Sequence, residues 1–446
     1  MQQLNKLIEF RQAVYEHGFT KARDAQFELL DSLLLSPTTR SFAELSTSGA
    51  FRRRWPSIYT AVEDGQQDRA WIEAQFVQLL PAQDLYVLAL DRTVWPHPQA
   101  RSLPDRQYVH AEGSPGTRET VVIGHPYSLL TWVVAPNASW ALPLSVRRLP
   151  SQQTDVALGV EQVQQVSRAL AQRHPTSLVV VVADGQYGNQ RFLAPLADDR
   201  AILLTRLRCN RVLYGPPPPK TPGQRGAPRK HGARFALADP ATWGRPAAEE
   251  EHTTDRAWGR VRLRRWDNLH AKQDATCVFS VLLIEAHLDR EHPAPPFWLI
   301  FRPPPGRQAA EWSLWDVWHW YPWRWPVEPS IRFRKQELHW TQPMFQQPER
   351  CDRWTMVVTL AQWHLYLART LVEDHPQPWQ PPQQALTPRR VQQGWPWLFA
   401  LLQTPARPPQ TRGKSPGWPQ GQARTPLERH KVVRKGPPRP KRKKRR

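Results

Sequence analysis

Cysteine is scarce in this chain of 446 residues, which contains only Cys209, Cys277 and Cys351. The three are far apart, without a Cys-x-x-Cys pair or a paired Cys/His motif, which excludes a disulfide framework and a zinc finger or ribbon. Long apolar runs are also missing, because no stretch approaches the ~18 uninterrupted apolar residues that a membrane span needs. The charged, amphipathic start of the chain is unlike a secretory signal. We therefore expect a soluble, reduced, cytoplasmic protein.

Acidic residues are outnumbered by basic ones, since 39 Asp and Glu stand against 61 Lys and Arg, for a net charge of +22. Much of this charge lies at the C-terminus, where residues 411–446 contain 14 Lys and Arg and one acid. That stretch carries +13, which leaves +9 for the first 410 residues. A charge of this size attracts polyanions, and DNA or RNA is the first candidate.

The first 80 residues carry apolar side chains at helical spacing. A basic cluster follows in the same region and consists of Arg52, Arg53 and Arg54. Short helices beside such a cluster are typical of a DNA-binding domain, of helix-turn-helix type or similar. The alternative is an ordinary helical cap with a solvated, charged face.

From residue 85 the pattern changes to that of a mixed α/β domain. Short apolar runs at 85–91, 127–136, 177–184 and 201–207 predict strands, and an amphipathic pattern predicts a helix over 155–173. The periodicity and composition together divide the chain into five parts. These are a helical DNA-binding domain at 1–80, the first part of an α/β core at 81–207, a β-rich insertion at 208–296, the second part of the core at 297–375, and a proline-rich, basic, disordered tail at 376–446.

Three acids are placed where a metal site could form. Asp91 and Asp184 each close a predicted strand, and Glu328 lies early in a predicted helix between Pro326 and Pro329. Acids at the ends of adjacent strands share one edge of a sheet, and a third from a packed helix can complete the oxygen ligands that Mg²⁺ requires. The alternative is that these are ordinary strand-end and helix-cap carboxylates.

The segment around Glu328 carries a more specific pattern, in which Tyr321, Arg324, Glu328 and Lys335 stand at fixed spacings. It resembles the tyrosine–arginine–glutamate–lysine signature of insertion-sequence transposases in the DDE superfamily. Asp91 in LALDRT and Asp184 in VVADGQYGN also fit that family. The resemblance covers residues 1–375 and is strongest at 321–340.

The resemblance implies an RNase H-like core in which Asp91, Asp184 and Glu328 are catalytic and hold two Mg²⁺ ions, for which Mn²⁺ can substitute. It implies DNA contacts by Tyr321, Arg324 and Lys335. The implied partners are the inverted-repeat ends of a mobile element and target DNA, bound by a homodimer at the nucleoid of a prokaryote. Glu328 and Lys335 are seven residues, or two helical turns, apart, so both side chains leave the helix on the same face.

Some positions depart from the family pattern. Trp325 follows the arginine where phenylalanine is usual, Pro329 follows the glutamate, and Ile331 stands where an aromatic residue is common. These changes keep open a second hypothesis, in which the chain is a catalytically inactive, transposase-derived DNA-binding protein. In the insertion, the resemblance implies that an aromatic side chain such as Trp258 or Trp266 stacks on an unpaired base.

Overall fold

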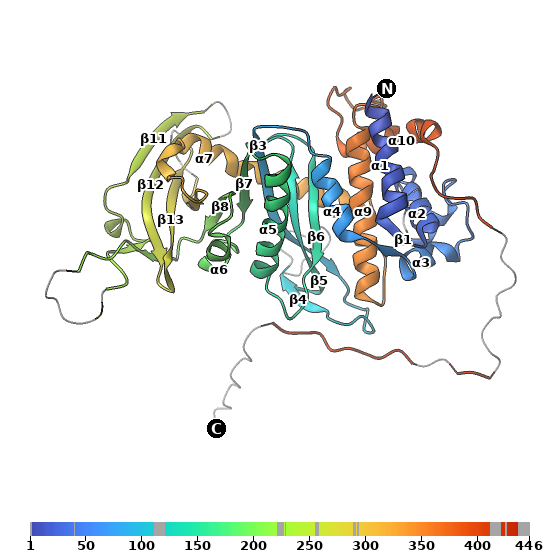
Figure 1. The fold of residues 1–446 in the computed structure, drawn as a ribbon, viewed down its shortest axis with the longest axis horizontal. Coiled ribbons are helices and arrows are strands. Elements are labelled where there is room, and N and C mark those ends of the chain that lie inside the picture. The colour runs from blue at the N-terminus through green and yellow to red at the C-terminus, as the bar shows by residue number, and fades with distance from the viewer. Residues whose placement is uncertain are drawn as a thin grey trace.

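The computed structural model describes residues 2–39, 41–110, 121–220, 227, 229–254, 258–288, 291, 294–410, 421–423 and 426–435. An N-terminal helical region lies at one end, a mixed sheet in the middle and a β-rich part at the other end (Figure 1). Within the described residues, no helix combines the length and the apolar character that crossing a membrane requires.

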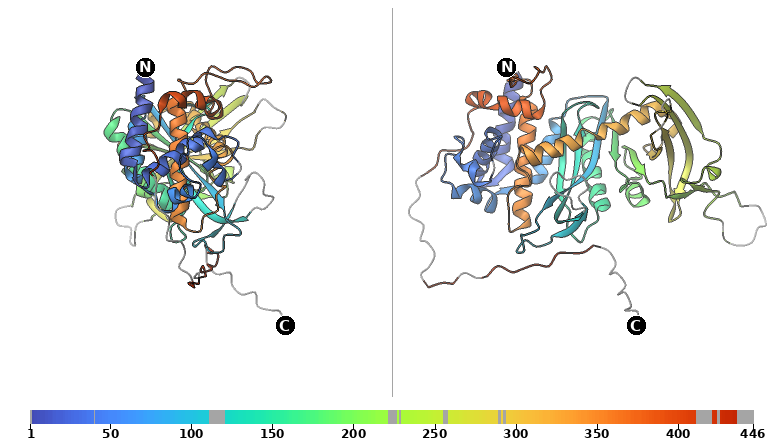
Figure 2. Two further views of the ribbon diagram at one scale, coloured as in Figure 1. Left: turned by 90° about the vertical axis from the view of Figure 1, so that its right-hand side faces the viewer. Right: turned by 180° about the vertical axis from the view of Figure 1, so that it is seen from behind.

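The N-terminal region is helical, as the periodicity predicts. Its elements are α1 (Gln2–Ala13), a π-helical turn (Val14–Gly18), α2 (Arg23–Leu35), a 3-10 turn (Ala43–Thr47), α3 (Pro56–Glu63) and α4 (Arg69–Gln78), with a small sheet of β1 (Phe19–Lys21) and β2 (Gln66–Gln67). These helices pack around α9 (Pro348–Ala368), which comes from the other end of the chain (Figure 2). The N-terminal helices and α9 therefore belong to one hydrophobic core.

The centre of the molecule is a mixed sheet in which β6, β5, β3, β7 and β8 lie side by side in that order. Strands β3 (Leu85–Pro96), β7 (Leu178–Ala183) and β8 (Ile202–Leu207) are parallel to each other, whereas β5 (Val121–Val133) runs antiparallel to both of its neighbours, β3 and β6 (Ala141–Arg148). Helix α5 (Asp155–Arg173) covers one face between β6 and β7 (Figure 1). This is the mixed-sheet, RNase H-like fold class that the sequence predicts.

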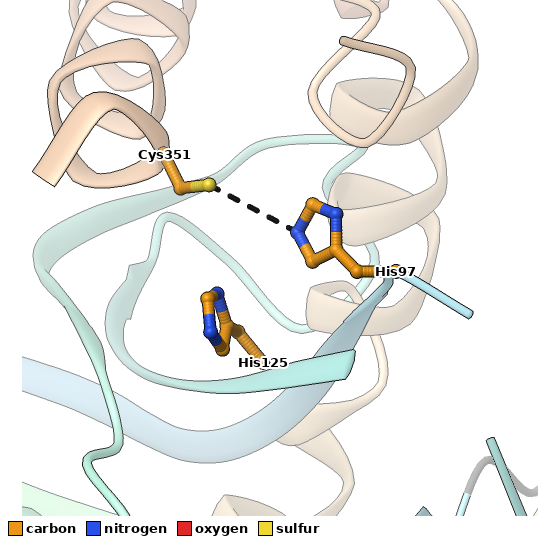
Figure 3. A group of neighbouring side chains, drawn as sticks. All are labelled: His97, His125 and Cys351. Carbon is orange, nitrogen blue, oxygen red and sulfur yellow. Dashed lines mark hydrogen bonds between the residues drawn. The ribbon is translucent and has the colours of Figure 1, made fainter. Parts of the chain in front are cut away.

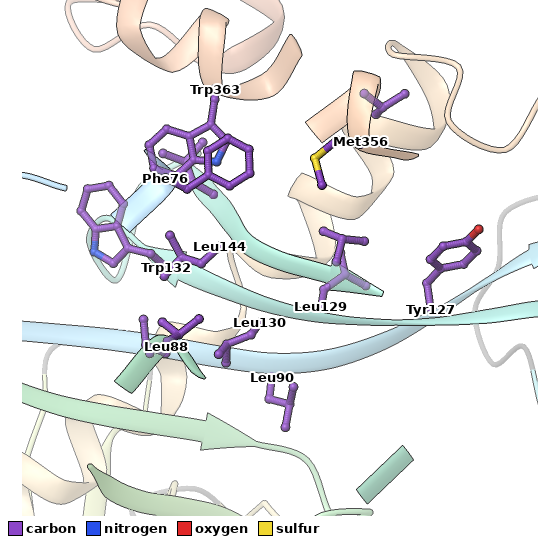
Figure 4. Close-up of a cluster of buried hydrophobic side chains, with 14 of the residues drawn as sticks. Phe76, Leu88, Leu90, Tyr127, Leu129, Leu130, Trp132, Leu144, Met356 and Trp363 are labelled. Carbon is purple, nitrogen blue, oxygen red and sulfur yellow. The ribbon is translucent and has the colours of Figure 1, made fainter. Parts of the chain in front are cut away.

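Helix α9 closes the β6 edge of the sheet, whereas the face opposite α5 packs against Tyr321 and Val327. Trp132 and Leu144 of the sheet pack near Phe76 of α4 and Trp363 of α9 (Figure 4). The rings of Phe76 and Trp363 are stacked, with centroids 5.0 Å apart. Burial of such large aromatic surfaces stabilises the junction of β6, α4 and α9.

In the central sheet, the sequence analysis missed β4 (Gln107–His110) and β6. Strand β6 contains Pro143, which argues against a central strand because proline cannot donate a ladder hydrogen bond. Its only strand partner among the described residues is β5, so it is an edge strand, where proline is tolerated.

The β-rich stretch extends the central sheet through β14 (Phe297–Arg302), which pairs with β8. Its strands are β9 (Val212–Tyr214), β10 (Arg234–Ala236), β11 (Ala248–Thr253), β12 (Arg260–Ala271) and β13 (Asp274–Glu285). Helix α7 (Leu314–Trp320) lies against β11 and β12. The basic loop 225–232 falls partly outside the described residues.

The C-terminal part differs from the expected disordered tail, because residues 388–402 form helix α10. Thr387 caps it by accepting a hydrogen bond from the Arg390 backbone, and Val391 and Trp395 are fully buried against α9 and α2. The prolines around this stretch, including Pro396 within the helix, hid its apolar face in the sequence. Residues 436–446 lie outside the described part of the chain.

Candidate active site

A cleft with a volume of about 1360 Å³ opens beside the ends of the parallel strands. Its walls come from β3, β14, α8 (Val327–Gln336) and the segments after β7 and β8. The three acids singled out in the sequence all line it, and so do two of the basic residues of the signature: Asp91, Asp184, Glu328, Arg324 and Lys335. Side chains that are up to 244 positions apart in the chain thus share one cavity.

Asp91 and Asp184 occupy equivalent positions on neighbouring parallel strands. Leu90 of β3 and Ala183 of β7 are the last register partners, and each acid is the next residue. The sequence analysis expected β3 to end at Asp91. The strand instead continues to Pro96, paired with β5. What ends at Asp91 is the pairing with β7, which opens the sheet and leaves room for the cleft.

Glu328 is the second residue of α8, near the N-terminus of the helix, as its flanking prolines predict. The helix is fixed to the sheet by Ser330, whose hydroxyl donates to the Ala141 carbonyl at 2.7 Å. The Gln362 side chain of α9 donates to the same carbonyl at 2.9 Å and to the Ser330 hydroxyl at 2.8 Å. A buried hydrogen-bond network between β6, α8 and α9 therefore sets the position of Glu328.

The charges in the cleft act strongly on Asp91. Burial raises the pKa of its carboxyl, and the nearby carboxylates of Asp184 and Glu328 raise the pKa further. The Arg324 guanidinium, whose Nη2 lies 4.0 Å from an Asp91 oxygen, opposes this and lowers the pKa. Oxygen ligands of like charge around a buried carboxylate fit a hard divalent cation, which would neutralise their repulsion.

The three carboxylates are more widely spaced than a compact ligand group. Among the described residues, a single set of three potential ligands has its atoms all within 4.8 Å of each other, and it consists of His97, His125 and Cys351 instead. A two-ion site does not need all its carboxylates in mutual contact, because two ions roughly 3.5–4 Å apart can share one bridging acid. Asp91 is the acid whose pKa responds to both of the other carboxylates.

The profile of a protein family described as DDE superfamily endonuclease matches residues 14–272, more than half of the chain. The chain belongs to the DDE superfamily endonucleases. The matched range includes Asp91 and Asp184 and ends before Glu328, so the signature segment of this DDE protein lies outside it. No curated protein matches the chain.

Solved structures give a weaker likeness to this DDE protein. One of them is titled "Crystal structure of the Mos1 mariner paired end complex with Mn" and is 12% identical over 37% of this chain and 54% of that chain, with a TM-score of 0.15. The match thus spans about half the length of the mariner protein. At this TM-score the likeness supports no residue-by-residue correspondence.

Besides Arg324, the cleft contains other basic side chains. Lys335, two turns after Glu328 on α8, is largely buried, and this burial lowers its pKa to about 8. Arg206 and Arg208 also line the cleft and were not singled out in the sequence. Arg206 is the fifth residue of β8. An arginine that interrupts an apolar strand was the only sign in the sequence that this side chain lines a site.

Tyr321 does not line the cleft of this DDE protein. Its ring is buried against Phe297, with centroids 6.0 Å apart, and the Arg324 guanidinium lies 6.0 Å from the ring centre on the cleft side. The ring therefore supports Arg324, and the expected contact of Tyr321 with DNA stays a prediction.

The arginine cluster at 52–54 lies in the connection between the 3-10 turn and α3, and none of its members lines the cleft. Arg52 and Arg53 both pair with the fully buried Glu28 of α2, and Arg52 donates to the Ala406 carbonyl at 2.7 Å. Arg54 is exposed. Two of the three predicted DNA contacts therefore have a structural role, and Arg54 is the member placed to meet a partner.

The two tryptophans of the β-rich stretch also differ. Trp266 is buried, which leaves its ring unavailable to a base unless the strand moves. Trp258 is partly exposed and stacks on Trp325 of the signature segment, with centroids 5.4 Å apart. Trp325 itself is 48% exposed, so this pair is the aromatic surface closest to the prediction of a base-stacking platform.

Proposed function

We propose that this DDE superfamily member is a DNA transposase of the cut-and-paste type, which cleaves transposon ends and transfers the strands into target DNA. The observation that carries the proposal is the convergence of Asp91, Asp184 and Glu328 on one cleft, together with Arg324 and Lys335. Membership of the endonuclease family agrees with such chemistry.

In this proposal the three carboxylates hold two Mg²⁺ ions, and Mn²⁺ can substitute for them. When bound, such ions activate a water or 3′-hydroxyl and stabilise the leaving oxygen at the scissile phosphate. Asp91, Asp184 and Glu328 are the residues that would hold these ions. Arg324 and Lys335 grip phosphate oxygens beside the scissile bond, as charge-assisted donors do.

The DNA partner follows from the same cleft. Arg206, Arg208 and Arg332 add positive charge to its lining, which suits a sugar–phosphate backbone rather than a small neutral substrate. Joining two element ends to one target requires two active sites, so we infer a homodimer assembled on DNA.

The test is cleavage of duplex DNA that carries the sequences flanking the gene, with Mg²⁺, Mn²⁺ or Ca²⁺. We expect cutting at the element ends with Mg²⁺ and Mn²⁺, and its loss in Asp184→Asn with DNA binding retained. Asp198→Asn is the matched control, because Asp198 is exposed and does not line the cleft. Equal cleavage by Asp184→Asn and the wild type would contradict the proposal.

The second candidate is an inactive, transposase-derived DNA-binding protein. It is favoured by Pro329 directly after Glu328 and by the spacing of the carboxylates beyond 4.8 Å. Specific binding to the element ends without cutting in any of the three metals would decide for it.

A further inference from the structure

A second group of potential ligands lies where the end of β3, strand β5 and the start of α9 meet, and none of its members lines the acidic cleft. His97 directly follows β3, His125 is in β5, and Cys351 is in the first turn of α9. Each of the three is fully buried. Their side chains point toward one another, and one ligand atom of each lies within 4.8 Å of the others (Figure 3).

The hydrogen bonds of the two histidines leave nitrogens facing this gap. His125 Nε2 lies 3.0 Å from the Pro104 carbonyl, and a ring nitrogen beside a carbonyl must carry the proton and donate. Its Nδ1 is then a lone-pair donor, and it has no hydrogen-bond partner. A histidine that binds a metal through one ring nitrogen commonly donates the N–H of the other to a backbone carbonyl, which fixes the tautomer.

His97 reaches the same gap from the opposite strand. Its Nε2 is 3.9 Å from Cys351 Sγ, and its Nδ1 is also buried without a partner. A buried polar atom without a partner is destabilising, and the two histidines each have one. An ion between the three side chains would satisfy the His125 nitrogen and use the lone pair of His97 Nε2.

We propose that His97, His125 and Cys351 bind a Zn²⁺ ion that joins the end of β3 and strand β5 to the start of α9. Two imidazoles and a thiolate are a nitrogen and sulfur set that suits Zn²⁺ rather than Mg²⁺. Ligands at ordinary zinc distances stand about 3.5 Å apart, so separations of up to 4.8 Å need to contract by at most about 1.3 Å. The fourth position of a tetrahedral ion is left for a water.

The protonation states fit this assignment. Burial lowers the pKa of His97 to about 3 and also lowers that of His125, so both rings are neutral and ready to donate lone pairs. Burial raises the pKa of the Cys351 thiol, so zinc binding releases its proton. The nearby cations are held by oxygens, since Arg106 donates to the His97 carbonyl and Arg148 pairs with Asp105 and Asp352.

The site is independent of the proposed nuclease chemistry, because its ligands are soft and none of the three lines the cleft. Its effect is structural: it fixes α9, which holds Glu328 through Gln362, against the strand that carries Asp91. His97 and His125 are 28 positions apart, and His125 and Cys351 are 226 positions apart. No short-range spacing motif could therefore predict the group.

The test measures metal in the purified full-length protein by elemental analysis, after dialysis against a weak chelator. We expect about one zinc per chain in the wild type and in Cys277→Ser, a buried cysteine elsewhere, and a loss of at least tenfold in Cys351→Ser and His125→Ala. Replacement of zinc by Co²⁺ should give a thiolate-to-cobalt charge-transfer band that is kept in Cys277→Ser and lost in Cys351→Ser.

The wild-type measurements stand even if a ligand variant fails to fold. A wild-type protein without zinc and without the cobalt band would overturn the proposal, and so would copper in place of zinc. Zinc retained by Cys351→Ser at the level of Cys277→Ser would do the same.

Discussion

Arg324 and Asp91 form a close pair at the centre of the acidic cleft, with Nη2 and Oδ2 4.0 Å apart. The arginine comes from the turn before α8 and the acid from β3, so the pair joins the two halves of the core. Among the charged neighbours of Asp91, Arg324 is the one that favours its ionised form. Arg324 therefore favours the ionised form of this half-buried carboxylate, while Asp184 and Glu328 oppose it.

The first prediction concerns the pH dependence of DNA cleavage in Arg324→Ala. A carboxylate must lose its proton to bind a metal, and removal of Arg324 raises the pKa of Asp91 beyond the increase that burial causes. The acid limb of the pH–rate profile should therefore move to higher pH. The control is Arg332→Ala, which removes an exposed arginine of the same cleft and should lower the rate without moving the limb. Identical limbs in wild type and Arg324→Ala would show that the pair does not tune Asp91.

The second prediction is that Asp91→Asn stabilises the metal-free protein while abolishing cleavage. The folded-state pKa of Asp91 lies above its unfolded value, so its contribution to stability is present below the unfolded pKa and is lost as the pH rises through the folded pKa. At neutral pH the charge is therefore a cost, which asparagine removes while its oxygen still accepts the Arg92 N–H bond. We expect a melting temperature higher by about 2 °C, against no change in Asp198→Asn. A decrease would contradict this account.

The third prediction compares two glycines that follow Asp184. A Cβ at Gly188 would lie 2.2 Å from the Arg206 carbonyl oxygen, whereas at Gly185 the nearest atoms are 3.7 Å away. Gly188→Ala should cost about 1–3 kcal/mol and lower cleavage, because it pushes the loop after Asp184 away from β8. Gly185→Ala should stay within about 0.5 kcal/mol of the wild type. Thermal unfolding checks both, and equal melting temperatures would show that the loop yields easily.

The fourth prediction separates structure from DNA contact in the arginine cluster. Arg53→Ala removes a partner of buried Glu28 and should lower the melting temperature by about 2–4 °C. Arg54→Ala should leave the melting temperature unchanged, weaken DNA binding and reduce the slope of log affinity against log salt by about 1. Binding to a fluorescent duplex over a range of salt concentrations measures the slope. Wild-type affinity and slope in Arg54→Ala would show that the cluster does not contact DNA.

Local patterns in the sequence predict much of the core. Helix α5 begins and ends where its apolar periodicity does, and Asp91 and Asp184 were found from short apolar runs followed by an acid. Such signals are local, because strand and helix periodicities extend over a few residues. Strand β6 and helix α10 were missed since Pro143 and Pro396 interrupt patterns that tertiary packing sustains.

Relationships across the chain are beyond local patterns. That Tyr321 is buried beneath Arg324, and that Arg52 and Arg53 are bound to Glu28, follows from packing between distant segments. The group of His97, His125 and Cys351 forms only when α9 closes on the sheet. The sequence gives the identity of each of these residues, but it does not show which distant residues pack against them.

The most direct measurement of the central claim is the location of Mn²⁺ by anomalous diffraction from crystals of the wild-type protein soaked in that ion. The account predicts density within about 2.2 Å of carboxylate oxygens of Asp91 and Asp184, and of Glu328 when DNA is bound. The same crystals of Asp184→Asn should lose it. Anomalous density elsewhere on the protein, with none between Asp91 and Asp184, would contradict the account.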